Sequence, residues 1–447
     1  MSNSAETHNS IPSRDDTHAL QTARNLLDRL FSHYTDHPYA VCLWDGQTIS
    51  SESGEKPDFT LVLTHPGSLR NMLIPPGELS LAEAYLRGDF DIQGDIIAAM
   101  SLTSALDQLK LQDWLGMVRM VLSLPQGHAP HEYLQGRQPA EVSGTRHSKE
   151  RDRAAVTYHY DTGNDFYRLF LGKWMAYSCA YFTAPQVDLD TAQAAKFEHI
   201  CRKLRLKQGD RLLDIGCGWG GLVLYAAQNY GVQALGITLS QPQVDYGNAW
   251  IQRAGLDGKA RLELRDYRDL SSLDPFDKVV SVGMFEHVGR EKQSEYFQSA
   301  FNSLRPGGLF LNHGIAAVSG LKPSWLERIF LQRGRFVDQY VFPDGELLLI
   351  STALDFVEET GFEVRDVESL REHYALTLRS WVSNLEGNYQ QAVQIKDERT
   401  YRTWRLYMAA SAYGFENGQI NLYQALLSKS RQGYAELPFT RADIYQP

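Results

Sequence analysis

The chain has 447 residues and is 43% apolar, which is enough material for more than one hydrophobic core, so we expect two domains. Its 44 Lys and Arg against 54 Asp and Glu give a net charge of −10 without a basic cluster, which argues against nucleic acid as a partner. The polar start MSNSAETHNS does not resemble a signal peptide, and no apolar run approaches the roughly 20 residues that cross a bilayer. The composition therefore predicts a soluble, cytoplasmic protein.

The first part of the chain is predicted to be a tail followed by a small α+β domain. Residues 1–19 are polar, with too little apolar content to offset the entropy of ordering, so we expect a disordered tail. Residues 20–125 hold the strand-like runs HPYAVCLWDG and FTLVLTH and the helix and strand of LAEAYLRGDFDI, with the helix ending at Gly88. The last segment, residues 111–124, predicts a helix with one buried stripe: Leu111, Trp114, Leu115, Val118, Val121 and Leu122.

A linker and a larger domain follow. Residues 126–150 are poor in large apolar side chains and carry Gly and Pro, which is typical of linkers. In residues 151–447 short β-rich runs alternate with helix-length stretches, the pattern of a doubly wound α/β sheet. The runs are RLLDI, VQALGI, ARLEL, KVVSVG, GLFLNH, FEVRDV and INLYQALL. The connection at residues 317–349 is unusually long and predicts a lid or binding element.

A glycine-rich turn follows the run RLLDI. The chain reads DIGCGWGG, with Asp214 at the strand end and Gly216, Gly218 and Gly220 in the turn before a helix. Glycines lack Cβ atoms, so the backbone can approach a ligand closely at a helix N-terminus. A dinucleotide site would need an acidic residue at the end of the next strand, and none is present there. This turn is typical of S-adenosylmethionine-dependent methyltransferases.

The second strand ends in polar residues instead. Thr238 and Gln243 offer a hydroxyl and an amide that can hydrogen-bond a ribose diol. From the residues alone, a helix cap at Thr238 and a surface amide at Gln243 fit as well. The four cysteines show no CxxC spacing, so neither a disulfide framework nor a metal site is expected.

Five stretches together resemble one family. They are YHYDTGNDFY, YSCAYF, DIGCGWGG, FEHVG and FPDG, in that order, within about residues 155–428. The family is that of the cyclopropane-fatty-acid and cyclopropane-mycolic-acid synthases. The resemblance implies a class I methyltransferase sheet with inserted substrate-binding segments, a smaller N-terminal domain similar to lipid-transfer folds, and a homodimer.

The resemblance also implies a cofactor site. Tyr177, Ser178 and residues 212–220 match the positions around the methionine end of S-adenosylmethionine, and residues 238–243 match those at the ribose. Tyr267 and Arg268 match the residues that flank the adenine. Other members have Trp-Glu at these two positions, so Arg268 departs from the family pattern.

The reacting carbon is expected beside a second set of residues. Cys179, Glu286, His313 and Tyr374 match positions that hold a bicarbonate ion in the family. An alkene that takes the sulfonium methyl becomes a carbocation, so the site must accept a proton and exclude water. From the residues alone, Glu286 also fits a helix-start carboxylate and the other three fit core packing. Ser411 stands where many relatives have cysteine, and we expect activity without that thiol.

The function implied by the resemblance is transfer of a methyl(ene) group to the cis double bond of an unsaturated phospholipid, which gives a cyclopropane ring. The enzyme would then bind peripherally to the inner face of the membrane. Alternatives are the same transfer ending in a methyl-branched or methylene product, methylation of an amine or hydroxyl, and a non-catalytic lipid-binding protein.

Overall fold

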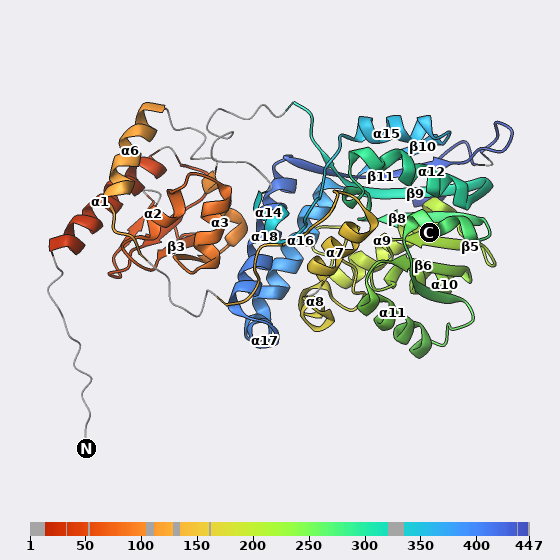
Figure 1. Cartoon of the computed structure of the whole chain (residues 1–447), viewed down its shortest axis with the longest axis horizontal. Coiled ribbons are helices and arrows are strands. Elements are labelled where there is room, and N and C mark those ends of the chain that lie inside the picture. The colour runs from red at the N-terminus through yellow and green to blue at the C-terminus, as the bar shows by residue number, and fades with distance from the viewer. Residues whose placement is uncertain are drawn as a thin grey trace, which may run out of the picture. The chain divides into compact units, whose positions relative to one another are not determined.

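The computed structural model describes residues 14–32, 34–51, 54–103, 111–127, 135–160, 162–320, 335–435 and 437–445 (Figure 1). By its contacts the chain divides into two units, and each has its own sheet. The first comprises Met1–Gly136 with Lys322–Phe336, and the second comprises Arg137–Leu321 with Val337–Pro447. Helix α1 (Arg14–Phe31) begins inside the expected tail, whose other residues lie outside the described ones.

The first unit is built on a four-stranded sheet in the order β2-β1-β3-β4. Strands β1 and β3 run parallel, and the other two pairs are antiparallel. Its elements are β1 (Tyr39–Cys42), β2 (Thr48–Ser50), β3 (Phe59–Leu63), β4 (Phe90–Gly94), α2 (Ser68–Leu73), α3 (Glu78–Leu86) and α4 (Ile96–Ala99). Helix α3 ends just before Gly88, which has a φ of 73°, as the sequence predicts.

The stripe predicted for residues 111–124 is wrong in part. The helix α6 (Leu111–Ser123) is present, but Leu115 and Leu122 are 61% and 49% exposed. Val121 is buried as predicted, and Met117 and Leu124 are buried in place of the two leucines. The segment carries two overlapping apolar stripes at helical spacing, and packing against the rest of the unit selects only one. The side chains of Leu111 and Trp114 lie outside the described residues.

The second unit contains a seven-stranded sheet in the order β10-β11-β9-β8-β5-β6-β7. Every β-rich run of the sequence forms one of its strands, which confirms the doubly wound α/β prediction. They are β5 (Arg211–Ile215), β6 (Gln233–Thr238), β7 (Ala260–Leu264), β8 (Phe276–Val282), β9 (Leu304–Ala317), β10 (Glu363–Ser369) and β11 (Ile420–Ser428). Strand β11 alone is antiparallel to its neighbours β9 and β10.

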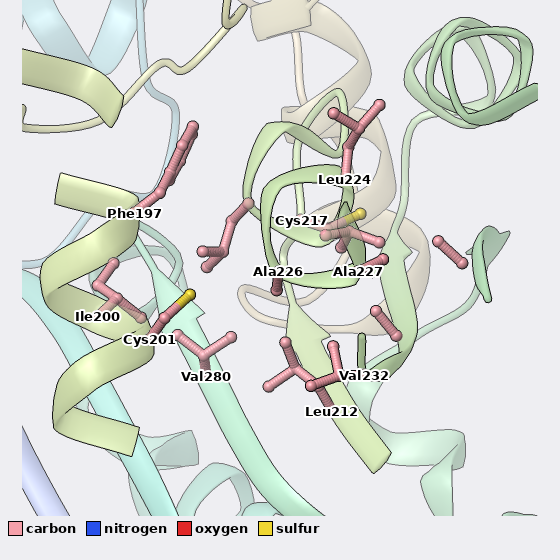
Figure 2. Packing of buried hydrophobic residues seen from close by; sticks show 14 of the residues in the cluster. Phe197, Ile200, Cys201, Leu212, Cys217, Leu224, Ala226, Ala227, Val232 and Val280 are labelled. Carbon is pink, nitrogen blue, oxygen red and sulfur yellow. The ribbon is translucent and has the colours of Figure 1, made fainter. Parts of the chain in front are cut away.

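Helices cover both faces of this sheet. α9 (Leu189–Leu204), α10 (Gly221–Tyr230) and α11 (Gln241–Arg253) contribute to one core, and α12 (Gln293–Ser303) and α15 (Ile350–Glu359) to the other. Figure 2 shows part of the first core, to which α9 contributes Phe197 and Ile200, α10 contributes Leu224 and β5 contributes Leu212. The next residue, Leu213, belongs to the opposite core. Both faces are buried, which is why the central strands are almost continuously apolar.

The order in which the chain adds strands to the sheet reverses at β5. The chain passes outward from β5 to β6 and β7, then returns to β8 on the other side of β5. In such sheets the ligand crevice lies outside the carboxyl ends of the strands at this switch point. The fold therefore opens a crevice at the ends of β5 and β8.

The expected linker is shorter than residues 126–150. Asn71 Nδ2 donates to the Gly127 carbonyl at 3.0 Å in the first unit, whereas Arg137 Nε donates to the Tyr340 carbonyl at 2.6 Å in the second. Residues from Arg137 onward therefore belong to the second unit. Its other helices are α7 (Lys149–Tyr160), α8 (Asn164–Leu171), α14 (Arg335–Tyr340), α16 (Arg371–Gly387), α17 (Tyr389–Ile395), α18 (Glu398–Glu416) and α19 (Ala442–Tyr445), with short turns η2 (Tyr267–Ser272), η3 (Phe285–His287) and η4 (Arg290–Lys292).

The long connection after β9 is closed at its base, where the Ala317 amide donates to the Leu348 carbonyl at 2.9 Å. Its residues 321–334 lie outside the described ones, so its predicted role as a lid stays a prediction. Within the described stretches, no helix is both long and apolar enough to span a membrane.

Candidate active site

A cavity lies in the crevice at the carboxyl ends of β5, β6 and β8. It has two adjoining parts that share Tyr160, Gly216, Gly218 and Gly283 in their walls. One part lies toward the end of β6 and the other toward α9. Together they bring most of the predicted cofactor residues to one place: Tyr177, Ser178, Asp214, Gly216, Gly218, Thr238, Gln243, Tyr267 and Arg268.

The glycine turn after β5 has the conformation that its sequence demands. Gly216 and Gly218 have φ values of 80° and 54°, where side chains with a Cβ are strained. No atom lies within 4 Å of the position that a Cβ of Gly218 would take, so this turn leaves space for a ligand. Gly220 differs, because its Cβ position lies 2.9 Å from Leu262. Its role is to begin α10 against the core, and it does not line the cavity.

The polar pair after β6 is buried within the site. Thr238 Oγ1 donates to Gln243 Oε1 at 2.7 Å, and both residues are less than a tenth exposed. The residue that caps α11 is Ser240, so Thr238 is not the helix cap, and Gln243 is not a surface amide. The Tyr160 hydroxyl lies beside the Gln243 amide. These groups can hydrogen-bond a ribose.

Arg268 is surrounded by carboxylates at the outer end of the cavity. Its guanidinium donates to both oxygens of Asp266, at 2.7 and 2.6 Å, and to Asp152 at 3.0 Å. Burial alone would raise the pKa of Asp266, but the hydrogen bonds from Arg268 outweigh it and hold this pKa below its ordinary value. The positive charge of Arg268 is therefore balanced by the carboxylates of Asp266 and Asp152.

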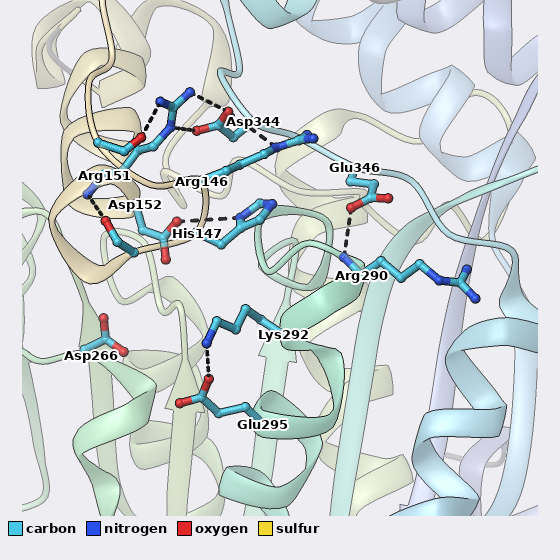
Figure 3. Close-up of polar contacts among 12 residues, drawn as sticks. Arg146, His147, Arg151, Asp152, Asp266, Arg290, Lys292, Glu295, Asp344 and Glu346 are labelled. Atoms are coloured by element: carbon cyan, nitrogen blue, oxygen red, sulfur yellow. Dashed lines mark hydrogen bonds and ion pairs between the residues drawn. The ribbon is translucent and has the colours of Figure 1, made fainter.

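A second ion pair closes the same end of the cavity (Figure 3). Arg151 of α7 donates from Nε and Nη2 to Asp344, at 2.5 and 2.9 Å. Asp344 and the neighbouring Phe342 line the cavity from the loop after α14. Phe342 stacks on His159 of α7 with the ring centroids 3.8 Å apart. The two chain segments are thus held together as one wall.

The four residues predicted beside the reacting carbon are all buried in one region. Tyr374 is close enough to Cys179 and Glu286 for their charges to affect its pKa. Glu286 Oε2 lies 3.3 Å from the Cβ position of Gly314, the residue after His313. Burial raises the pKa of the Cys179 thiol, so this thiol stays protonated and is a poor nucleophile.

Two polar atoms of this group lack partners. Glu286 Oε2 and His313 Nε2 are buried without a hydrogen bond among the described residues. Burial raises the pKa of Glu286 to about 7, against hydrogen bonds from backbone groups including Ile315. Burial lowers the pKa of His313 well below its ordinary value, so the imidazole is neutral. Gln424 Nε2 lies 3.1 Å from His313 Nδ1, and an amide that donates there leaves the proton on Nε2.

Some residues of the cavity were not predicted. Lys196 and Asp152 line it, and His159 and His287 contribute imidazoles to its wall. Lys196 lies on the buried face of α9. A lysine among the apolar residues of that face was the signal in the sequence that could have pointed to it. Of the aromatic residues in YHYDTGNDFY and YSCAYF, Tyr160 and Tyr177 line the cavity, whereas Tyr181 stacks on His199 and His373.

Comparison with known proteins identifies the family. A family model described as mycolic acid cyclopropane synthetase matches residues 147–425, more than half of the chain. The chain belongs to this family. A second model, a domain of unknown function, matches residues 26–109.

Relatives of this family member extend over most of its length. A probable fatty acid methyltransferase of Pseudomonas putida is 43% identical over 92% of this chain and 96% of its own. The cyclopropane-fatty-acyl-phospholipid synthase of Escherichia coli is 35% identical over 80% and 85%. A sphingolipid C9-methyltransferase of Komagataella phaffii is 33% identical over 79% and 70%. The solved structure of a mycolic acid cyclopropane synthase with SAH and CTAB is 34% identical, with a TM-score of 0.58 over 62% of this chain and 97% of its own.

The chain is therefore an S-adenosylmethionine-dependent methyltransferase with the class I sheet, from a family that modifies lipid acyl chains. The cavity fits this cofactor in its own right. Asp214 Oδ1 is buried in it without a partner and can accept from an ammonium group. Gly218 leaves open space, and Thr238 with Gln243 offers groups for a ribose.

Proposed function

We propose that this enzyme transfers a methyl(ene) group from S-adenosylmethionine to the cis double bond of an unsaturated phospholipid acyl chain and so forms a cyclopropane ring. The E. coli relative carries that activity in its name. The observation that carries the proposal is the buried group of Glu286, His313 and Tyr374. It reaches the cavity wall through Glu286, whose Oε1 lies 3.9 Å from the Cβ position of Gly283. An amine or hydroxyl methyltransferase has no need of such a group.

The residues around Glu286 suit a reaction with a cationic intermediate. Bound S-adenosylmethionine supplies a methyl group to the alkene, which leaves a carbocation on the acyl chain that becomes a ring after it loses a proton from the new methyl. Cys179, His313 and Tyr374 are each less than a tenth exposed, so the region excludes water that would trap the cation. The aromatic faces of Tyr160 and Tyr177 can stabilise a cation by about 0.5–2 kcal/mol each.

We propose further that a bicarbonate ion accepts the proton. His313 Nε2, with its proton, and the Tyr374 hydroxyl are donors for such an anion, and Glu286 Oε2 can accept from its hydroxyl. Glu286 Oε2 and His313 Nε2 lack hydrogen-bond partners among the described residues, so an ion between them would satisfy both. A protein carboxylate in direct contact with the carbocation would instead risk alkylation.

One alternative product is supported by the relatives. The sphingolipid C9-methyltransferase and the probable fatty acid methyltransferase are named for methyl transfer and not for ring formation. The same cation gives a methyl-branched alkene when a proton leaves a neighbouring carbon of the acyl chain. It gives a methylene group when a hydride first shifts from the methyl-bearing carbon to the cationic carbon and the methyl then loses a proton. The position of the base relative to the cation decides between these outcomes.

Product analysis tests the proposal. Purified enzyme is incubated with methyl-labelled S-adenosylmethionine and vesicles of a mono-unsaturated phospholipid, and the acyl chains are analysed by mass spectrometry. A gain of one methylene with loss of the double bond supports the ring, and removal of bicarbonate should then slow the reaction. A product that keeps its unsaturation or carries a methyl branch supports the alternative. No labelled acyl chain at all would overturn both and favour a lipid-binding protein.

We also propose that the enzyme works at the bilayer surface, where its substrate lies, as a peripheral protein. Leu115 and Leu122 on α6 expose large apolar side chains on one face, with the exposed Arg119 between them. Apolar side chains flanked by a cation can enter the headgroup region of a membrane. Replacement of both leucines by glutamate should reduce flotation with anionic vesicles, and unchanged flotation would remove this helix from the interaction.

A further inference from the structure

The buried lysine of α9 in the cavity wall lacks a carboxylate partner. The side chain of Lys196 is only 1% exposed, and its Nζ donates to Ser178 Oγ at 2.9 Å. Within the described part of the chain this neutral hydroxyl is its hydrogen-bond partner. Removing an ammonium group from water without an anionic partner is unfavourable. Because no carboxylate of the described residues forms an ion pair with this ammonium group, the position can accept an anionic ligand.

The same helix carries a second buried lysine, Lys203, which pairs with carboxylates. Lys203 is as deeply buried as Lys196, but its Nζ lies 2.5 Å from Glu368 Oε2 and 3.4 Å from Asp366 Oδ2. It faces the side of the sheet where β10 lies and does not line the cavity. Two turns of one helix thus carry one lysine with carboxylate partners and one without them.

An opposite charge lies across the cavity from Lys196. Asp214, at the end of β5, lines the same part of the cavity and its Oδ1 has no hydrogen bond among the described residues. Burial lowers the pKa of Lys196 and raises that of Asp214, and the attraction between the two opposes both shifts. The wall therefore presents one cation and one anion, each with capacity for a further partner.

We propose that Lys196 binds the α-carboxylate of the methionine end of S-adenosylmethionine, while Asp214 binds the α-ammonium. An α-amino acid carries these two charges on one carbon atom, which matches a lysine and an aspartate on the walls of one pocket. Ser178 accepts a hydrogen bond from the ammonium of Lys196 and so fixes its position. The inference depends on the use of S-adenosylmethionine and not on which acyl product is formed.

The amino-acid end should then contribute much of the affinity through Lys196. Two ligands separate this contribution: S-adenosylhomocysteine, and 5′-methylthioadenosine, which has the same nucleoside and sulfur but no amino-acid group. Their dissociation constants are measured by calorimetry for the wild type, Lys196→Met and Lys203→Met. Lys196→Met should weaken S-adenosylhomocysteine on the order of 10- to 100-fold, as expected for loss of a charged hydrogen bond, and leave methylthioadenosine within about threefold.

Lys203→Met is the matched control. It removes an equally buried lysine from the same helix, so it should lower the thermal midpoint while the ratio of the two dissociation constants stays that of the wild type. If the ratio of the two dissociation constants is unchanged in Lys196→Met, the proposal is wrong. This holds even if turnover is lost, because the lysine would then act in the reaction without binding the carboxylate. Should Lys196→Met not fold, a decarboxylated analogue of S-adenosylhomocysteine tests the wild type directly. If the wild type binds S-adenosylhomocysteine and its decarboxylated analogue with equal affinity, Lys196 does not bind the carboxylate.

Discussion

Three buried ionisable side chains of the active site have pKa values near neutrality. Burial raises the pKa of Glu286 and of Asp214 to about 7 and lowers that of Lys196 to about 7. Each of them therefore changes charge near pH 7. Groups with such shifts gather at functional sites, because burial and a sparse set of partners leave them available to a ligand.

Replacement of Glu286 by glutamine tests the part of the site near the reacting carbon. The amide keeps the shape but cannot accept a proton or orient a bicarbonate as the carboxylate does. We expect turnover to fall on the order of 10²-fold or more, with the dissociation constant of S-adenosylhomocysteine close to that of the wild type. Glu295→Gln, at an exposed position of α12, is the control and should behave as the wild type. Unchanged turnover in Glu286→Gln would remove this residue from the mechanism.

The same variant should change the pH dependence of stability. The pKa of Glu286 in the folded protein is about 7, above its ordinary value of 4.5, because burial disfavours the charged form. The stability that the protonated group contributes is complete at low pH and is lost as pH rises through 7. Glu286→Gln avoids this loss, so its stability relative to the wild type should grow between pH 5 and pH 8, by up to about 3 kcal/mol. Denaturant titrations at both pH values measure it, and a constant difference would contradict the assigned pKa.

At the scale of elements, the cofactor cavity lies between the ends of the strands and a wall formed by two segments that are far apart in sequence. The glycine turn joins β5 to α10 and forms the floor, while α7 and the loop after α14 form the outer wall. Arg151 and Asp344 link these two segments. A bidentate pair between partly buried groups fixes orientation better than an exposed pair does.

Removal of this link should weaken cofactor binding without touching the methionine end. In Arg151→Met the loop that carries Asp344 and Phe342 loses its bidentate ion pair with α7, and we expect the dissociation constant of S-adenosylhomocysteine to rise by about 5- to 20-fold. Methylthioadenosine should be weakened by the same factor, because it shares the nucleoside. Lys149→Met breaks the nearby exposed pair with Asp269 and should have little effect on either ligand. Equal dissociation constants in Arg151→Met and Lys149→Met would show that the Arg151–Asp344 pair does not hold the loop after α14 against α7.

At the scale of the molecule, the two units have separate relatives. The solved mycolic acid cyclopropane synthase covers 62% of this chain and 97% of its own length, so the catalytic unit exists without a counterpart of the first unit. The domain of unknown function covers residues 26–109, within the first unit. We therefore expect the first unit to serve the encounter with lipid.

Deletion of residues 1–136 separates these roles. The remaining chain keeps the whole cofactor cavity, so its affinity for S-adenosylhomocysteine should stay within a few-fold of the full-length value. Its turnover on phospholipid vesicles should fall on the order of tenfold or more, whereas turnover on the same lipid dispersed in detergent should fall much less. Parallel loss of cofactor binding and of both activities would indicate that the first unit is needed only for the folding of the second.

The sequence by itself determined the sheet of the second unit and the cofactor turn. Strands buried on both faces need continuous apolar runs, and a turn with positive φ needs glycine. Both features therefore depend on the local sequence alone. The group of Glu286, His313 and Tyr374 was predicted only from the family resemblance, because from the residues alone each of them also fits a structural role.

Only the tertiary structure decided which of two apolar stripes of α6 is buried, that β11 enters antiparallel between β9 and β10, and that residues from Arg137 belong to the second unit. It also decided that Arg268 is neutralised by Asp152, and that Lys196 faces Asp214 across the cavity while Lys203 has its own carboxylates. The physical reason is the same in each case. Burial and charge pairing depend on partners that lie far away in the chain, and local spacing carries no information about them.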